Sequence, residues 1–160
     1  MKTLQIFLSL CGIIVLTISC NKEETKAQRP TLKVTYLDDF GKCFFFNNSK
    51  SGYVIDSDSL YQEIGKLNKV SYFVDCDTVK LPSIDFTKNT LLGIQTGTTQ
   101  CDSLSRSVIV DTVVKKYIYT INIIHFKELC SQELKVSMNW VLIPKVPYKY
   151  KVEFEVTAHN

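Results

Sequence analysis

The stretch YKYKVEFEVT at residues 148–157 decides the fold class, because its side chains alternate strictly between two kinds. Tyrosine, valine or phenylalanine stands at each even position, and lysine, glutamate or threonine at each odd one. Successive side chains of a strand point to opposite faces, so this alternation predicts a half-buried strand with one wet face. We interpret its row of lysines and glutamates as solvated sheet surface, which also discourages edge-to-edge pairing.

The same period of two recurs through most of the chain. It predicts further strands at Thr31–Tyr36, Lys42–Phe46, Gly52–Ile55, Leu91–Thr96, Ser107–Val113, Tyr117–Phe126 and Leu134–Ile143. We expect Leu134–Ile143 and the strand at Tyr148–Thr157 to form a hairpin, with Pro144–Pro147 as its connection.

One segment has helical spacing instead. Leu60, Ile64 and Leu67 stand at positions i, i+4 and i+7, and Ser59 with Gln62 has the spacing of a capping box. The sequence therefore predicts an α+β, mostly β fold. We expect an antiparallel sheet, or a small sandwich or barrel, of about eight strands with one short helix.

Length and composition limit the classes of function. The chain has 160 residues, 45% hydrophobic and 11% aromatic, which favours one folded domain over disorder. We place that domain at residues 31–160. With 19 basic and 16 acidic residues the net charge is +3, which gives no reason to expect a nucleic-acid partner.

The N-terminus is typical of an export signal. Lys2 is followed by an uncharged, mostly apolar run from Leu4 to Ser19, which is 16 residues long and short for a bilayer-spanning helix. The small Ser19 directly before Cys20 resembles the lipobox of bacterial lipoproteins, although Thr17 stands where such proteins usually carry leucine. The resemblance implies a signal peptide at 1–19, cleavage before Cys20 and acyl chains on Cys20.

Three acyl chains would hold the protein to a membrane, since even one buried chain contributes ~0.8 kcal/mol per methylene. Residues 20–30 are polar, without apolar periodicity, and predict a flexible tether. Asn21 is not the aspartate of inner-membrane retention, and Lys22–Glu24 resembles a surface-export signal. We therefore expect an outer-membrane lipoprotein, on the cell surface or on the periplasmic face.

The even cysteine count of the mature domain suggests two disulfides in an oxidising compartment. If Ser107–Val113 and Tyr117–Phe126 form a hairpin that turns at Lys115–Lys116, directly opposed residues have numbers adding to about 231. Cys101 and Cys130 satisfy this sum. Cys43–Cys76 follows by exclusion. No pair of these thiols has the close spacing of a zinc site.

No catalytic, cofactor or metal constellation is visible in the sequence. His125 ends a predicted strand without a nucleophile motif, and His159 is next to last in the chain. We interpret both as structural or surface residues. The glycines of 93–99 lack a phosphate-loop pattern, and Asp38-Asp39 and Asp75-Cys76-Asp77 favour turns over calcium sites. We interpret the aromatic run Phe44-Phe45-Phe46 as core.

Four tripeptides share the pattern aspartate, serine or threonine, aliphatic residue. They are Asp58-Ser59-Leu60, Asp77-Thr78-Val79, Asp102-Ser103-Leu104 and Asp111-Thr112-Val113. The pattern resembles an O-glycosylation sequon that some bacteria use on exported proteins. The alternative is that aspartate followed by a hydroxyl residue is a common turn and cap pair.

Ile84-Asp85-Phe86, followed by Leu91-Leu92-Gly93 and a β-rich tail, resembles the C-terminal domain of a family of bacterial protease-complex subunits over about residues 60–157. That resemblance implies a small exported or lipid-anchored protein, and no functional residue follows from it. Our leading hypothesis is a lipid-anchored, non-catalytic binding or scaffolding module for an envelope protein or glycan. The alternatives are an accessory or inhibitor-like subunit of an envelope protease, and a hydrolase with an unrecognised site that includes His125.

Overall fold

The computed structural model describes residues 32–44, 52–67, 76, 80–126 and 133–159. Its elements in chain order are β1 (Thr35–Tyr36), α1 (Asp38–Cys43), β2 (Tyr53–Ile55), α2 (Asp58–Leu67), β3 (Asn89–Thr98), β4 (Asp102–Asp111), β5 (Lys116–His125), β6 (Lys135–Pro144) and β7 (Lys151–His159). The predicted signal peptide, Cys20 and the tether lie outside the described residues.

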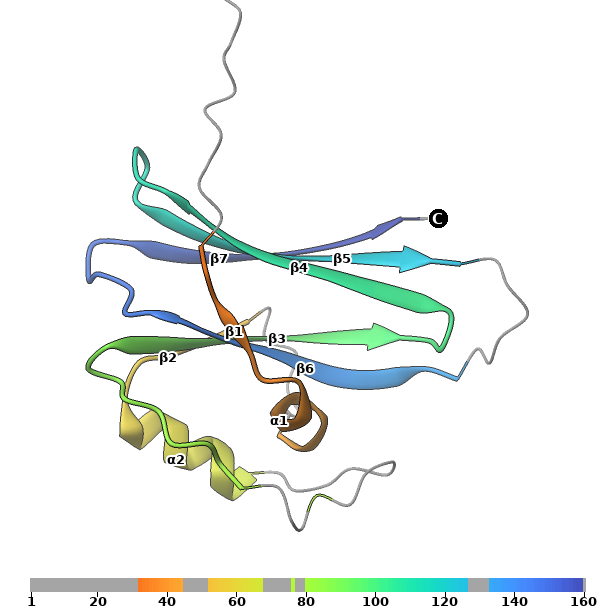
Figure 1. Cartoon of the computed structure of the whole chain (residues 1–160), viewed down its shortest axis with the longest axis horizontal. Helices are drawn as coiled ribbons and strands as arrows, with labels where there is room; N and C mark the ends of the chain where they lie inside the picture. The colour runs from red at the N-terminus through yellow and green to blue at the C-terminus, as the bar shows by residue number, and fades with distance from the viewer. Residues whose placement is uncertain (1–31, 45–51, 68–75, 77–79, 127–132, 160) are drawn as a thin grey trace, which may run out of the picture.

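The strands form two sheets that face each other (Figure 1). One sheet has four strands in the order β1-β6-β3-β2, and the other has three in the order β4-β5-β7. Every pair is antiparallel except β5 with β7, which run parallel. The predicted α+β, mostly β class is confirmed, as a two-sheet arrangement.

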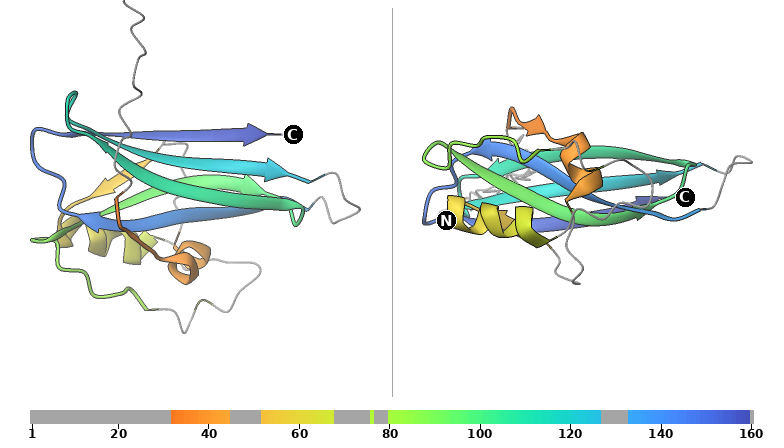
Figure 2. Two further views of the ribbon diagram at one scale, coloured as in Figure 1. Left: turned by 45° about the horizontal axis from the view of Figure 1, so that its top comes forward. Right: turned by 90° about the horizontal axis from the view of Figure 1, so that it is seen from below.

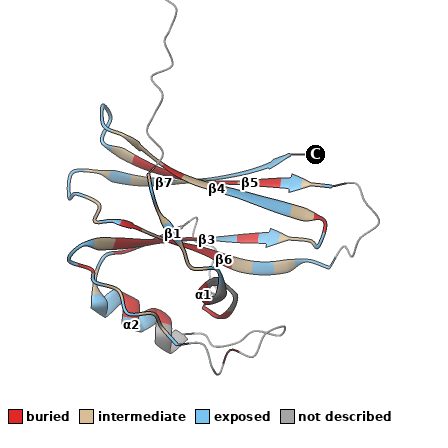
Figure 3. Ribbon diagram, viewed as in Figure 1, coloured by how far each residue is buried: buried red, intermediate tan, exposed pale blue. Residues whose placement is uncertain are grey.

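The helices add a third layer on the outer face of the four-stranded sheet (Figure 2). One apolar core lies between the two sheets and includes Tyr119 and Ile121, both 0% exposed. A second core lies between the four-stranded sheet and the helices and includes Phe40 and Tyr61. β3 and β6 therefore have apolar residues on both faces, and Figure 3 shows buried residues along both strands.

Trp140 of β6 is the centre of the second core. Its ring is fully buried, lies 5.5 Å from the ring of Phe40, and donates a hydrogen bond from Nε1 to the carbonyl of Phe44 at 2.8 Å. Gly93 of β3 is the register partner of Trp140. A Cβ atom at Gly93 would collide with the indole ring, so glycine is required there for close packing.

The strand predicted at Lys42–Phe46 is wrong: Lys42 and Cys43 belong to helix α1, and Phe44 follows as its C-cap. Phe40, Cys43 and Phe44 follow one another at positions i, i+3 and i+4, and all three are buried against the sheet. This spacing is helical, and the aromatic run hid it in the sequence. Phe44 packs in the core as predicted, while 45 and 46 lie outside the described residues.

The predicted helix is present as α2, but its start and its buried face differ from the prediction. The cap is Ser57 and not Ser59: the Ser57 hydroxyl accepts a hydrogen bond from the Leu60 amide at 3.5 Å. Tyr61 and Ile64 are each 3% exposed, whereas Leu60 is 48% exposed. Tyr61 supplies the aromatic anchor, and its hydroxyl donates to the Pro82 carbonyl at 2.7 Å.

The β4–β5 hairpin is confirmed, and its predicted register is wrong by four residues. Asp111 pairs with Lys116 and Asp102 with His125, so opposed numbers add to 227. The turn spans four residues because the Asp111 carboxylate accepts the amides of Val113 and Val114 and Lys115 adopts a φ of 53°. The prediction of a two-residue turn at Lys115–Lys116 did not take the capping role of Asp111 into account.

The hairpin predicted for the last two strands does not form. β6 belongs to the four-stranded sheet, and β7 crosses to the other sheet, where it pairs parallel to β5. The six residues between Pro144 and Lys151 are enough to cross the ~10 Å that separates packed sheets. The alternating pattern predicted which face of β7 is buried, but it did not predict which strand pairs with β7. The lysines and glutamates of the predicted solvent-facing side are exposed.

The predicted bridge between Cys43 and Cys76 is present, with Cα atoms 5.5 Å apart. It ties helix α1 to the segment before β3. Cys101 is also disulfide-bonded. Its predicted partner, Cys130, lies outside the described residues, so that pairing stays a prediction. In the observed register the Cys101 carbonyl accepts the amide of Phe126.

Candidate functional site

A groove opens where the two edge strands β2 and β7 lie on the same side of the sandwich. It encloses about 260 Å³. Its walls come from β2, β3, the β6–β7 connection and β7, and they are formed by Val54, Asp56, Thr90, Val146, Pro147, Tyr148, Tyr150 and Val152. Three valines, two tyrosines and one proline line this surface together with Asp56 and Thr90, so the groove offers apolar contacts and polar atoms in similar measure.

The β6–β7 connection is held rigidly to the end of the four-stranded sheet. The Val146 amide donates to the Thr90 hydroxyl at 3.0 Å, and the Lys145 amide donates to the Lys88 carbonyl at 2.7 Å. The Lys145 ammonium also donates to the carbonyl of Asp56 at 2.7 Å. These bonds tie the connection to β2 and to the turn before β3, so the groove is formed before any ligand arrives.

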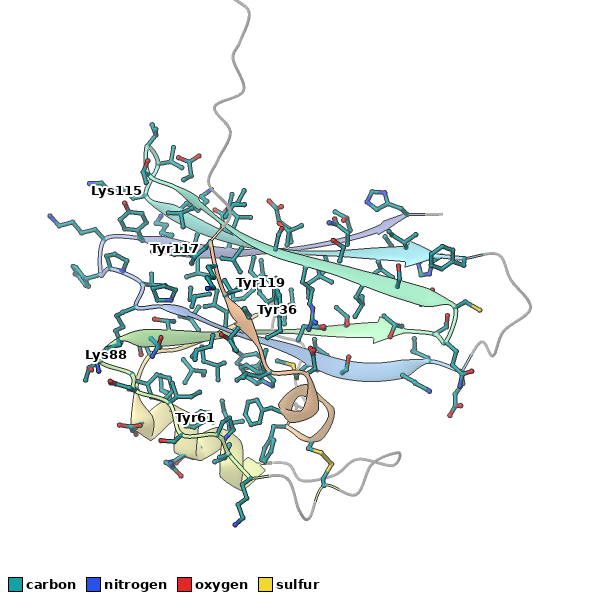
Figure 4. All side chains as sticks on the ribbon, in the orientation of Figure 1. Tyr36, Tyr61, Lys88, Lys115, Tyr117 and Tyr119 are labelled. Carbon is teal, nitrogen blue, oxygen red and sulfur yellow. A yellow bond between two sulfur atoms is a disulfide. The ribbon has the colours of Figure 1, made fainter. Side chains whose placement is uncertain are left out.

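Two tyrosines of this connection have different environments. Tyr150 packs edge-on against Tyr117 of β5, with ring centroids 5.5 Å apart. Burial raises the pKa of Tyr117. Figure 4 shows this residue beside the turn that contains Lys115. Tyr148 is fully exposed, at 101%. The connection therefore combines a fixed aromatic wall with one free ring at the rim.

His125 pairs with a carboxylate at the opposite end of β5. Its Nδ1 lies 2.5 Å from Oδ1 of Asp102, whose side chain is only 2% exposed. The Thr99 amide donates to the other carboxylate oxygen at 2.5 Å and, with the imidazole, lowers the pKa of Asp102. Among the described residues no hydroxyl or thiol hydrogen-bonds to His125. The pair closes the end of the β4–β5 ladder beside Cys101.

The other sequence candidates have local structural roles. His159 is the exposed last residue of β7, and residues 93–98 continue β3 as predicted. Asp38 begins α1 instead of lying in a turn. Of the second acidic group, 75 and 77 lie outside the described residues. No group of three or more histidine, cysteine or acidic side chains in the described ranges has the placement to hold a metal ion.

Asp85 of the Ile84-Asp85-Phe86 motif organises the turn before β3. Its carboxylate accepts the amide and hydroxyl of Thr87, at 3.0 and 2.5 Å, and pairs with Lys88 at 2.9 Å. The Thr87 hydroxyl and Lys88 hold the pKa of Asp85 at about 2, and Phe86 is buried. This turn also positions the Lys88 carbonyl that holds the groove connection.

A polar cluster fixes the start of the domain at the opposite edge of the sandwich. The guanidinium of Arg106 lies 4.3 Å from the ring centre of Tyr36 and 2.5 Å from the carboxylate of Asp38. The Tyr36 hydroxyl donates to the Arg106 carbonyl at 2.8 Å, and burial raises the pKa of Tyr36. These groups satisfy one another, so the cluster anchors β1 to β4.

Sequence reasoning missed the groove, because its walls come from segments far apart in the chain. The available signal was Tyr148, an aromatic residue directly after a proline in a connection. Within the described part of the chain no helix is long and apolar enough to span a membrane. Comparisons with protein-family models, with curated proteins and with solved structures find no match to this chain.

Proposed function

We propose that this protein is a lipid-anchored, non-catalytic binding module of the bacterial envelope that takes its ligand in the groove between β2 and β7. The observation that carries the proposal is the fully exposed Tyr148 at the rim of a groove whose other walls are fixed. An exposed aromatic ring beside a wall of fixed side chains is a typical anchor for recognition.

The compartment is supported by two features. The Cys43–Cys76 bridge is buried and belongs to the second core, and such bridges persist in oxidising compartments. The sequence up to Cys20 has the charge and apolar pattern of an exported lipoprotein. Each feature points outside the cytosol independently of the other.

The groove favours an extended polypeptide as ligand. β2 is the edge strand of its sheet, and its Val54 and the adjoining Asp56 line the groove. An extended segment that enters the groove meets side chains of valine and tyrosine and the acidic residue Asp56. Recognition at a strand edge, with side chains in adjacent pockets, is a common mode of peptide binding.

A crosslinking experiment in cells of the native host tests the groove. We would place a photoreactive phenylalanine analogue at Tyr148 of the full-length protein and, as a matched aromatic control, at Phe126, which is 50% exposed at the other end of the sandwich. We expect one discrete envelope polypeptide to be captured from position 148 and not from position 126. Equal capture at both positions would refute the groove.

The identity of the captured species tests the ligand class. A discrete polypeptide supports the proposal, and a protease among the captured species would favour the accessory-subunit alternative. A polydisperse carbohydrate product would overturn the polypeptide ligand.

The lipid anchor has its own test: labelled palmitate should be incorporated into the wild-type chain and not into Cys20→Ala. Failure of the wild type to incorporate it, or recovery of the chain in the cytosolic fraction, contradicts the anchor.

A further inference from the structure

The tripeptides of aspartate, hydroxyl residue and aliphatic residue occupy unrelated parts of the fold. Ser59 lies in the first turn of α2, Ser103 lies in β4, and Thr112 lies in the turn between β4 and β5. All three residues are exposed. The fourth, Thr78, lies outside the described residues. A shared pattern in a helix, a strand and a turn has no common explanation in local backbone structure.

The aliphatic residue that follows each hydroxyl residue is also exposed. Leu60 is 48%, Leu104 36% and Val113 89% accessible to solvent. Burying such a side chain contributes about 1.5–3 kcal/mol, and α2 buries Tyr61 directly after Leu60. Val113 thus has almost no packing contact, and Leu60 and Leu104 each keep a third to a half of their surface open to solvent beside the hydroxyl residue.

Hydrogen bonds in turns explain why an aspartate stands at positions 102 and 111, but they do not explain the hydroxyl residue that follows each aspartate. Asp111 caps its turn and Asp102 bonds to the Thr99 amide, as described above. Among hydrogen bonds between described residues, none uses the side chain of Ser59, Ser103 or Thr112. Each of these hydroxyls is both exposed and unused by the fold.

Ser57 is an internal comparison beside the same helix. It also follows an aspartate, but an aspartate comes after it where the other tripeptides have an aliphatic residue. Its hydroxyl is used by the fold, since it caps α2 through the Leu60 amide. The one Asp-Ser pair that lacks the aliphatic residue is thus the one whose hydroxyl has a structural role.

We propose that Ser59, Ser103 and Thr112 are acceptors of an O-linked sugar, attached outside the cytosol by a transferase that recognises the exposed hydroxyl together with the exposed aliphatic side chain that follows it. The hydroxyl oxygen attacks the anomeric carbon of a sugar diphosphate donor. The bond between that carbon and the diphosphate oxygen breaks, the diphosphate leaves, and the hydroxyl proton passes to a base of the transferase. No redox partner is needed.

Mass spectrometry of the full-length protein from the membrane fraction of its native host tests the inference. We expect an intact mass above that of the lipidated polypeptide, and fragmentation that places sugar on Ser59, Ser103 and Thr112. Ser59→Ala, Ser103→Ala and Thr112→Ala should each remove one glycan increment. Leu60→Gln, which keeps the hydroxyl of Ser59, should remove the same increment as Ser59→Ala.

Control variants separate glycosylation from changes in folding. Ser57→Ala weakens the cap of α2 and should keep every increment, and so should Ser105→Ala, which removes an exposed serine of β4 that no aspartate precedes. A mass equal to that of the lipidated polypeptide overturns the inference. So does a total mass increment that is unchanged in the combined Ser59→Ala, Ser103→Ala and Thr112→Ala variant, or a phosphate-sized increment. These outcomes do not depend on whether the groove binds a ligand.

Discussion

Removal of the Cys43–Cys76 bridge should destabilise the domain by about 4 kcal/mol. The two residues are 33 positions apart. In the chain-entropy treatment, a bridge that closes a loop of that length lowers the entropy of the unfolded chain by about 12.5 cal/mol/K, which stabilises the folded state by about 3.7 kcal/mol at 25 °C. Both cysteines are buried, at 0% and 4% exposure, so replacement by alanine adds a small packing loss. Domains of this size are stable by about 5–15 kcal/mol, so the loss is a large fraction of the total.

The measurement is urea unfolding of the full-length protein and of the Cys43→Ala/Cys76→Ala variant in detergent. Trp140 is the sole tryptophan and is fully buried, so its fluorescence follows the loss of the second core. In reducing buffer the wild-type protein loses the same bridge, and the difference between the two proteins should shrink to the packing loss. A difference below about 1 kcal/mol in oxidising buffer would refute the entropic argument.

Three further variants test the packing and the electrostatics of the fold. Gly93→Ala should cost about 1–3 kcal/mol because the added methyl group meets the ring of Trp140, and the unfolding midpoint in urea measures this loss. Asn139→Ala should cost about 1–3 kcal/mol in the same assay, since it removes the 2.8 Å hydrogen bond to the buried Thr96 hydroxyl. For Asp85→Asn we expect lower stability than wild type at neutral pH. The folded pKa of about 2 lies below the unfolded value of about 3.9, so the advantage of wild type is present above pH 4 and disappears as the pH falls to 2, which thermal unfolding across pH measures.

Local patterns predicted most of the strands because these patterns depend on burial alone, and they failed at Lys42–Phe46, where α1 ends. The alternation at Tyr117–Phe126 identified β5, whose even and odd positions face different environments in the structure. The helix at α2 was found from its spacing, with an error of one residue in its buried face. The prediction took only leucine and isoleucine as the apolar face of the helix. In the structure the Tyr61 ring is buried instead of Leu60.

Partner choice among strands could not be predicted, because it depends on the length and course of the connections. β7 presents the same alternation to either sheet, and only the six-residue connection allows it to leave β6. The register of the β4–β5 hairpin depended on one carboxylate, that of Asp111. The walls of the groove could not be predicted for the same reason, since they meet only where β7 crosses to lie beside β2.

The strand order places Leu32, the first described residue, and the groove at opposite edges of the sandwich. Leu32 donates its amide to the Val108 carbonyl of β4, and β1 is the outer strand of the other sheet on that side. β2 and β7, which border the groove, are the outer strands on the far side. If Cys20 carries acyl chains, the 11 residues between it and Leu32 reach at most about 40 Å, so the domain stays close to the membrane. An anchor joined to the domain through Leu32 would leave the β2–β7 edge free, so the proposed ligand would reach Tyr148 without displacing the chain that holds the protein in place.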